Sequence, residues 1–238
     1  MKSTNNDKRT FSMDDFEKGL MLSGFVSPCS INELNERLEL ESYEKKLRNE
    51  NKDIFFRRVV LAAEVAYQLH EEPTFGRIKF QKLVYLCEHV AQMNLQNRYT
   101  KQVAGPFDNK FMHSIENEFE TNKWFEVEKV KYGTMNRSKY KPLLLVENYK
   151  RYFQTYFAQH EKAIQQIIDL FRTETTDTTE VAATLYACQW ELKDTPAGMS
   201  ESDLLQKFYE WSEKKKRFKP DRVLSIWQWM TKKGLLSI

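Results

Sequence analysis

The residues whose types and spacing best suit ligand binding lie near the C-terminus, along one predicted helix. Pro220 is a favoured first helical residue and Gly234 a favoured residue just past a helix end, so we predict a helix between them. Val223, Trp227 and Met230 form its inner stripe. The opposite side carries, at spacings of three, three and four, Arg222, Ser225, Gln228 and Lys232.

These side chains are suited to nucleic acid. Arg and Gln can read guanine and adenine edges in a major groove, and Lys232 can contact phosphate. A dense basic turn precedes the helix and contains Lys214, Lys215, Lys216, Arg217 and Lys219. Residues 201–238 hold nine Lys or Arg against five Asp or Glu, whereas residues 161–200 hold three against seven. The two segments could instead face each other or water, so DNA contact is one of several alternatives.

Motifs for catalysis are not found. The chain has no Walker phosphate loop, GxGxxG turn, GxSxG elbow or HExxH helix. Its four histidines are isolated, and no Cys stands at metal-ligand spacing from a His. We therefore predict no catalytic residues, no metal site and no cofactor, and we expect a protein that is not an enzyme.

Two further apolar stretches precede the predicted C-terminal helix. The first, residues 180–190, buries Val181, Leu185 and Cys188. Ser200 can cap the second, with Asp203 reaching back as in a capping box. Its inner stripe consists of Leu204, Leu205, Phe208 and Trp211. Three short helices in succession predict a helix-turn-helix unit.

The segment GRIKFQKLVYLCEHVAQMNLQNRYTKQVAGPF, residues 76–107, predicts a buried helix, a polar connection and a tight corner. Gly105 permits an unusual backbone angle, Pro106 suits a helix start, and Asp108 suits a helix N-terminus. The buried stripe of the first helix consists of Phe80, Leu83, Val84, Cys87, Val90 and Ala91. A second amphipathic helix follows, with an apolar residue every four positions at Phe107, Phe111, Ile115 and Phe119.

The helix KFQKLVYL, residues 79–86, followed by the AGPF corner, residues 104–107, resembles the Panacea domain of antitoxin-like proteins from bacteria and their viruses. The likeness covers about residues 53–125, and it departs from the family pattern at Phe80 and Phe107, both of which keep apolar character. It implies a helical body that engages a protein partner. The partner-facing candidates on these motifs are Gln81, Lys82, Tyr85, Gly105, Pro106 and Phe107.

The C-terminal segments ATLYACQWELKD, DLLQKFYEW and KKKRFKPDRVLSIWQWMTKKGLL resemble the winged-helix-like tail of some type I restriction specificity subunits or their companions. A specificity subunit also carries two large target-recognition domains, for which this chain has no room. The resemblance therefore implies an accessory or regulatory protein.

A change of period after residue 124 predicts a β-hairpin. Residues 125–132 alternate between apolar and charged and are expected to form the first strand. A turn is expected at residues 133–136, and residues 137–141 are expected to form the second, antiparallel strand. Arg137, Lys139 and Lys141 fall on one face of the second strand. That face could bind phosphate, or it could keep an exposed strand edge soluble.

Length and composition fit a helix-rich protein. The 238 residues include only 7 Gly and 6 Pro, and the net charge of +3 is too small to indicate nucleic-acid binding by itself. Without a long apolar run or secretion signal, we expect a cytoplasmic protein with no membrane contact. Cys29, Cys87 and Cys188 are far apart in the sequence, and Cys87 and Cys188, which lie in apolar helical stripes, are expected to be reduced.

We predict a mainly α fold with a small β-hairpin and three regions. Residues 1–52 form an N-terminal arm, which could dock on the body or on a partner. Residues 53–160 form the Panacea-like helical domain, with Asp53 capping its first helix, and residues 161–238 form the helix-turn-helix-like or winged-helix-like domain.

Two functions follow from these patterns. The first is a non-enzymatic interaction or regulatory module of a prokaryotic defence or toxin–antitoxin system, whose partner is a toxin or a restriction subunit. The alternative is a DNA-binding transcriptional or restriction-associated regulator that uses the C-terminal helices.

Overall fold

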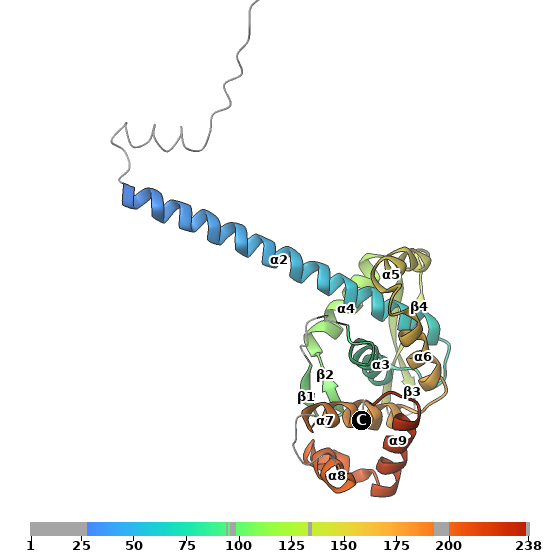
Figure 1. Cartoon of the computed structure of the whole chain (residues 1–238). Coiled ribbons are helices and arrows are strands. Elements are labelled where there is room, and N and C mark those ends of the chain that lie inside the picture. The colour runs from blue at the N-terminus through green and yellow to red at the C-terminus, as the bar shows by residue number, and fades with distance from the viewer. Residues whose placement is uncertain (1–27, 94, 96–98, 133–134, 193–199, 237–238) are drawn as a thin grey trace, which may run out of the picture. The chain divides into compact units, whose positions relative to one another are not determined.

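The computed structural model describes residues 28–93, 95, 99–132, 135–192 and 200–236. They form a mainly helical body with short antiparallel hairpins, which confirms the predicted fold class (Figure 1). The first helices and strands are α2 (Pro28–Leu69), α3 (Arg77–Val90), β1 (Thr100–Gln102), β2 (Gly105–Phe107), α4 (Asn109–Thr121), β3 (Phe125–Tyr132) and β4 (Met135–Pro142). The remaining elements are η1 (Val146–Asn148), α5 (Tyr149–Phe157), α6 (Glu161–Phe171), α7 (Thr176–Leu192), α8 (Glu201–Glu210), η2 (Glu213–Arg217) and α9 (Pro220–Lys232).

The chain divides into two compact units, residues 1–53 and residues 54–238. The helix α2 runs through this boundary, so the prediction that Asp53 starts a new helix is wrong. Asp53 lies in the interior of this continuous helix, so there is no helix end for its side chain to cap. No unit boundary falls near residue 160, and one core includes side chains from before and after it.

The core of the second unit surrounds α3. All residues from Lys79 to Glu88 are buried, and this helix packs against α6, α7, β2 and β4. In Figure 1, α3 lies between the strands and the helices of the C-terminal part. Among the described helices, none is both long enough and apolar enough to cross a bilayer.

Two hairpins border this core. The predicted one is present, with Phe125 paired to Pro142 and Glu128 to Lys139. A second, shorter hairpin was not predicted: β1 pairs with β2, and Lys101 lies opposite Pro106. Pro106 therefore belongs to a strand and does not start a helix, because α4 begins only after its N-cap Asp108. Asp108 accepts a hydrogen bond from the Phe111 amide at 2.9 Å, as its capping position predicted.

The C-terminal helices have the predicted ends. Ser200 and Asp203 form a capping box at the start of α8, Pro220 begins α9, and Gly234 follows α9 with a φ of 70°. The helices α7, α8 and α9 pack on one another. Within residues 200–236 no strand follows α9, so these helices have no β wing in the described part of the chain.

Candidate functional site

The residues predicted to face a partner lie inside the body. Gln81, Lys82 and Tyr85 are almost fully buried on α3, Gly105 and Pro106 are buried on β2, and Phe107 is half-buried. A buried side chain cannot form a contact surface, so this prediction is wrong for the five buried residues in the conformation described, and it stays a prediction for Phe107. The helix α3 has packing neighbours on all sides, whereas its sequence predicted a single buried stripe.

These residues instead join α3 to the short hairpin. The Nζ of Lys82 donates to the Pro106 carbonyl oxygen at 2.5 Å, and the Nε2 of Gln81 donates to the same oxygen at 3.1 Å. Gly105 has a φ of 101°, and a Cβ there would lie 2.7 Å from the Oγ1 of Thr184 on α7. The Gly-Pro pair therefore lets the β2 backbone approach both α3 and α7.

A buried ion pair continues this arrangement into α7. The Nζ of Lys215 on η2 donates to Glu180 Oε1 at 2.8 Å and to Thr184 Oγ1 at 3.0 Å, with its side chain fully buried. Burial and the nearby Lys215 charge lower the pKa of Lys82 to about 7, although Glu180 opposes this. Lys215 was predicted to contact DNA, which its burial contradicts.

A third buried group links α2, α3 and α4. Arg58 donates to Glu88 Oε1 at 2.8 Å and to Asp108 Oδ2 at 3.0 Å, and its guanidinium lies 3.6 Å from the centroid of the Phe111 ring. Burial lowers the pKa of Arg58, but neighbouring Tyr99, Glu88 and Asp108 together raise it above its ordinary value. Arg58 is thus a permanent cation that holds three helices together.

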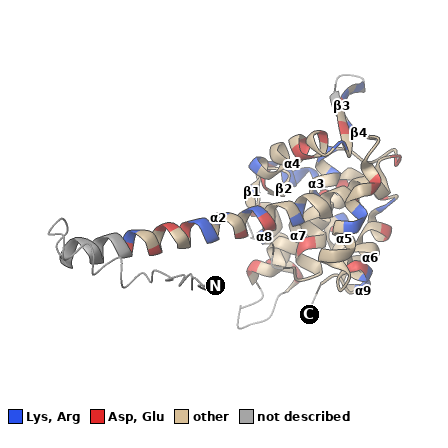
Figure 2. Ribbon diagram, turned by 90° about the horizontal axis from the view of Figure 1, so that it is seen from above, with Lys and Arg blue, Asp and Glu red and all other residues tan. Residues whose placement is uncertain are grey.

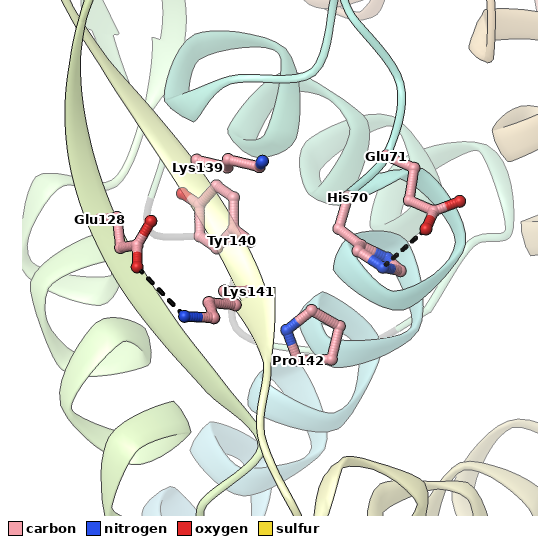
Figure 3. Close-up of a pocket in the computed structure, with 7 residues that line it drawn as sticks. All are labelled: His70, Glu71, Glu128, Lys139, Tyr140, Lys141 and Pro142. Atoms are coloured by element: carbon pink, nitrogen blue, oxygen red, sulfur yellow. Dashed lines mark hydrogen bonds and ion pairs between the residues drawn. The ribbon is translucent and has the colours of Figure 1, made fainter.

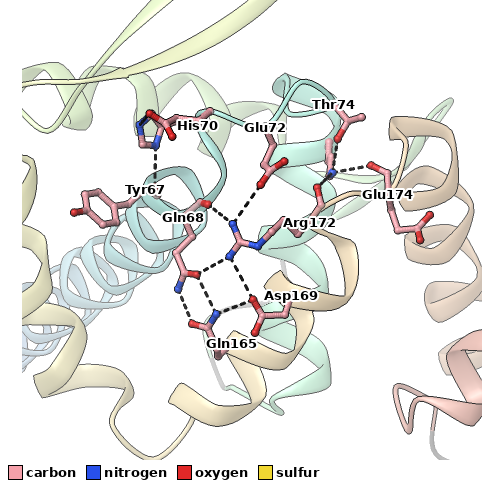
Figure 4. Close-up of polar contacts among 11 residues, drawn as sticks. Tyr67, Gln68, His70, Glu72, Thr74, Gln165, Asp169, Arg172 and Glu174 are labelled. Atoms are coloured by element: carbon pink, nitrogen blue, oxygen red, sulfur yellow. Dashed lines mark hydrogen bonds and ion pairs between the residues drawn. The ribbon is translucent and has the colours of Figure 1, made fainter.

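Lys79 is held by neutral oxygens. Its Nζ donates to Thr74 Oγ1 at 2.7 Å and to the carbonyl oxygens of Arg172 and Glu174 at 2.9 and 2.7 Å. Burial lowers its pKa to about 8, against the attraction of Glu72 and Glu174. Figure 4 shows that the Arg172 side chain contacts Gln68 and nearby carboxylates, so the α6–α7 connection is tied to the α2–α3 connection.

We call these groups the buried polar frame. They join elements far apart in the sequence through hydrogen bonds and ion pairs, and their charged side chains are buried in the body. Its defining residues are Arg58, Lys79, Gln81, Lys82, Glu88, Gly105, Pro106, Asp108, Glu180, Thr184 and Lys215. The sequence predicted four of them as a partner-facing surface, Lys215 as a DNA contact and Asp108 as a helix cap. Their common role was missed, because a Lys in a helical stripe gives no sign of its acceptors.

The other residues predicted to bind DNA are exposed. Arg222, Ser225, Gln228 and Lys232 all project from the outer side of α9, as predicted. Asp221 is exposed on the same helix, and the Nε2 of Gln228 lies 3.4 Å from Glu201 Oε1. In the preceding turn Lys214, Lys216 and Arg217 are exposed.

Several of these cations are already paired. Lys216 forms an ion pair with Glu213, and Arg217 pairs with Asp177 and Glu180. In the described part of the chain, five basic residues of this region make no ion pair with a carboxylate: Lys214, Lys219, Arg222, Lys232 and Lys233. Figure 2 shows basic residues around α9 next to acidic ones.

A pocket of about 540 Å³ lies between the end of α2 and the longer hairpin (Figure 3). Lys141 pairs with Glu128 at 3.5 Å, and the Nδ1 of His70 lies 2.8 Å from the Tyr67 carbonyl oxygen. Of the three basic residues on the strand face predicted to bind phosphate, Lys139 and Lys141 line this pocket. The third, Arg137, instead donates to the Phe75 carbonyl oxygen at 3.0 Å. The pocket is lined by His70, Glu71, Glu128, Lys139, Tyr140, Lys141 and Pro142.

Neither metal ligands nor relatives define a site. Among the described residues, no three His, Cys, Asp or Glu side chains gather so that they could hold a metal ion. A scan against protein-family models and a search of curated proteins found no match to this chain.

Proposed function

We propose that this chain is a non-enzymatic interaction and regulatory module of a prokaryotic defence or toxin–antitoxin system, similar to Panacea proteins. The observation that carries the proposal is the role of the resembling residues. Lys79, Gln81, Lys82, Gly105 and Pro106 all belong to the buried polar frame. Buried polar groups of this kind fix one arrangement of a fold, as a protein that works through its shape requires.

The frame leaves apolar side chains exposed on the elements that it joins. Val103, in the turn between β1 and β2, and Trp190, near the end of α7, are 47% and 51% exposed. The elements β2 and α7 are in contact, so the frame controls the placement of both side chains. Trp is enriched among the residues that dominate binding energies, which makes Trp190 our first candidate for a partner contact.

The test is co-expression of the chain with the proteins encoded by its neighbouring genes. We expect a stoichiometric complex with one of them, and Trp190→Ala should weaken it about tenfold or more. Leu144→Ala is the matched control, because Leu144 is 90% exposed in the turn between β4 and η1. A complex with a small toxic protein supports the antitoxin function, and one with a methylase or translocase subunit supports the restriction function. Failure of every neighbour to bind would contradict both.

DNA binding is the second candidate, favoured by the five basic residues around α9 that lack a carboxylate partner in the described residues. Duplex binding should weaken between about 50 and 200 mM salt, because each phosphate contact releases counterions. Arg222→Ala with Lys232→Ala should weaken it further. An affinity that is unchanged by salt and by these substitutions would exclude DNA.

A further inference from the structure

In the arm, residues 36–53 of α2 expose every side chain. Leu40, Tyr43 and Leu47 follow one another at spacings of three and four residues, which places them on one side of the helix. They are 59%, 59% and 40% exposed. This stretch of α2 buries none of its side chains, and an exposed apolar side flanked by charged residues indicates a surface that another helix covers.

The charges of the arm fall into two halves. Residues 36–44 contain four Glu and one Arg, whereas residues 45–53 contain three Lys, one Arg, one Glu and one Asp. Figure 2 shows acidic and basic residues along this part of the helix. Glu44 and Arg48 form an ion pair within the helix at 3.6 Å, and both side chains remain more than half exposed. Because the side chains of this stretch are exposed, its charged residues can face a partner of opposite polarity.

We propose that the arm pairs in antiparallel orientation with the arm of a second copy of this chain. A twofold axis between Tyr43 and Glu44 brings each acidic half beside the basic half of the other arm, since residue contacts at a twofold interface are reciprocal. Leu40 then lies level with Leu47 of the second copy. The charged residues at equal heights are Glu39 with Arg48, Glu41 with Lys46, and Arg37 with Glu50.

Parallel pairing in register does not have this complementarity. It would place Glu39 beside Glu39 and Glu41 beside Glu41, and like charges across a helix pair oppose association. A second copy in antiparallel orientation supplies both an apolar stripe and opposite charges. This inference is independent of the partner contact proposed for Trp190 on the body.

The first test measures the mass of the full chain in solution. At tens of micromolar we expect twice the 28.5 kDa of one chain. Leu40→Glu with Leu47→Glu should raise the dissociation constant of the dimer about tenfold or more, because two apolar contacts are lost on each arm. Leu38→Glu is the matched control: Leu38 is also exposed, at 49%, but it lies on the opposite side of the helix from Leu40. It should leave the dimer intact.

The second test uses charge reversal. Glu39→Lys with Glu41→Lys makes the arm mainly basic, and Lys46→Glu with Arg48→Glu makes it mainly acidic. We expect each variant alone to be monomeric and their mixture to form a heterodimer.

The orientation is tested by cross-linking in a Cys29→Ser background. Glu36 and Asn51 fall on the same side as Leu40 and lie fifteen residues, or about 22 Å, apart along one helix. In the antiparallel dimer Glu36→Cys should form a disulfide with Asn51→Cys of the other chain, and neither variant should cross-link to itself.

Four results would overturn the proposal. A chain that remains at 28.5 kDa at about 100 µM has no self-association of useful strength. If Leu38→Glu weakened the dimer as much as the Leu40 and Leu47 substitutions, the contact would not be on the Leu40 side of the helix. Cross-linking of Glu36→Cys to itself would show parallel pairing. An arm that binds only a different protein would also overturn it, and would leave the function proposed for the body untouched.

Discussion

The helices α3 and α9 have similar sequence patterns and opposite environments. Each has apolar residues at helical spacing and basic or amide side chains in the remaining directions, so both predicted a contact surface. In the structure Lys82 on α3 is 1% exposed, whereas Lys232 on α9 is exposed. An amphipathic pattern shows which residues must be buried, but it does not show which others also become buried.

The difference arises from what surrounds each helix. The body supplies acceptors for the polar side chains of α3, among them the Pro106 carbonyl oxygen and the Arg172 carbonyl oxygen. With such acceptors a buried ammonium is tolerated, although its pKa falls. The outer side of α9 meets water, so the same residue types there stay free for ligands.

The largest effect is expected at Arg58. Arg58→Ala leaves the buried carboxylates of Glu88 and Asp108 without their cation, so we expect a loss of about 3–5 kcal/mol in the free energy of unfolding. Arg217→Ala is the exposed counterpart: it also removes two ion pairs, but its side chain is 51% exposed, so the loss should be below about 1 kcal/mol. Chemical denaturation measures both, and similar losses would contradict the contrast.

Gly105 should show the next largest effect. Gly105→Ala puts a Cβ 2.7 Å from Thr184 Oγ1 at a φ of 101°, and we expect a loss of about 2–3 kcal/mol in the free energy of unfolding. Gly234→Ala is the control, because its φ of 70° is also positive but no atom lies within 4 Å of the new Cβ. It should cost about 1 kcal/mol. Thermal or urea unfolding of both variants separates crowding from backbone strain, and equal costs would show that β2 does not need its close approach.

Lys82 should make stability depend on pH. Its pKa of about 7 in the folded chain is below the ordinary 10.5, so between these values the unfolded chain binds more protons. The free energy of unfolding should therefore rise with pH across this window, and Lys82 should contribute about 1 kcal/mol per pH unit.

The measurement compares denaturation of the wild-type chain and of Lys82→Met between pH 7 and 9. The variant should lose the Lys82 part of the slope but keep that of Lys79, whose pKa is about 8. Lys232→Met on exposed α9 is the control and should keep the wild-type slope. An unchanged slope in Lys82→Met would show that the Lys82 ammonium remains charged inside the body.

Local signals predicted much of the fold. Ser200, Asp203, Pro220 and Gly234 mark helix ends through contacts within a few residues, and the structure has those ends. Continuity of α2 through Asp53 could not be predicted, because a helix-capping residue type is also tolerated within a helix. The pairing of β1 with β2 involves only three residues on each strand, too few for a recognisable alternation.

The buried polar frame was harder to predict than the fold. Its long-range bonds join residues 24 to 95 positions apart, such as Lys82 to Pro106 and Lys79 to Glu174. No spacing rule covers such distances, and a Lys or Glu near a helix stripe usually lies in water. The exposed side of α9 was predictable, because exposure is the ordinary state of charged residues.

The smallest effect is expected on α9 itself. Arg222→Ala and Lys232→Ala should each change the free energy of unfolding by no more than about 0.5 kcal/mol, because both side chains are exposed and neither bridges a carboxylate in the described residues. Their effect should appear only with a ligand. If α9 binds duplex DNA, each substitution should remove one phosphate contact and so reduce the magnitude of the slope of log affinity against log salt by about 1. If the substitutions lowered stability and left DNA affinity unchanged, the charges of α9 would stabilise the fold, as those of α3 do, and would not bind DNA.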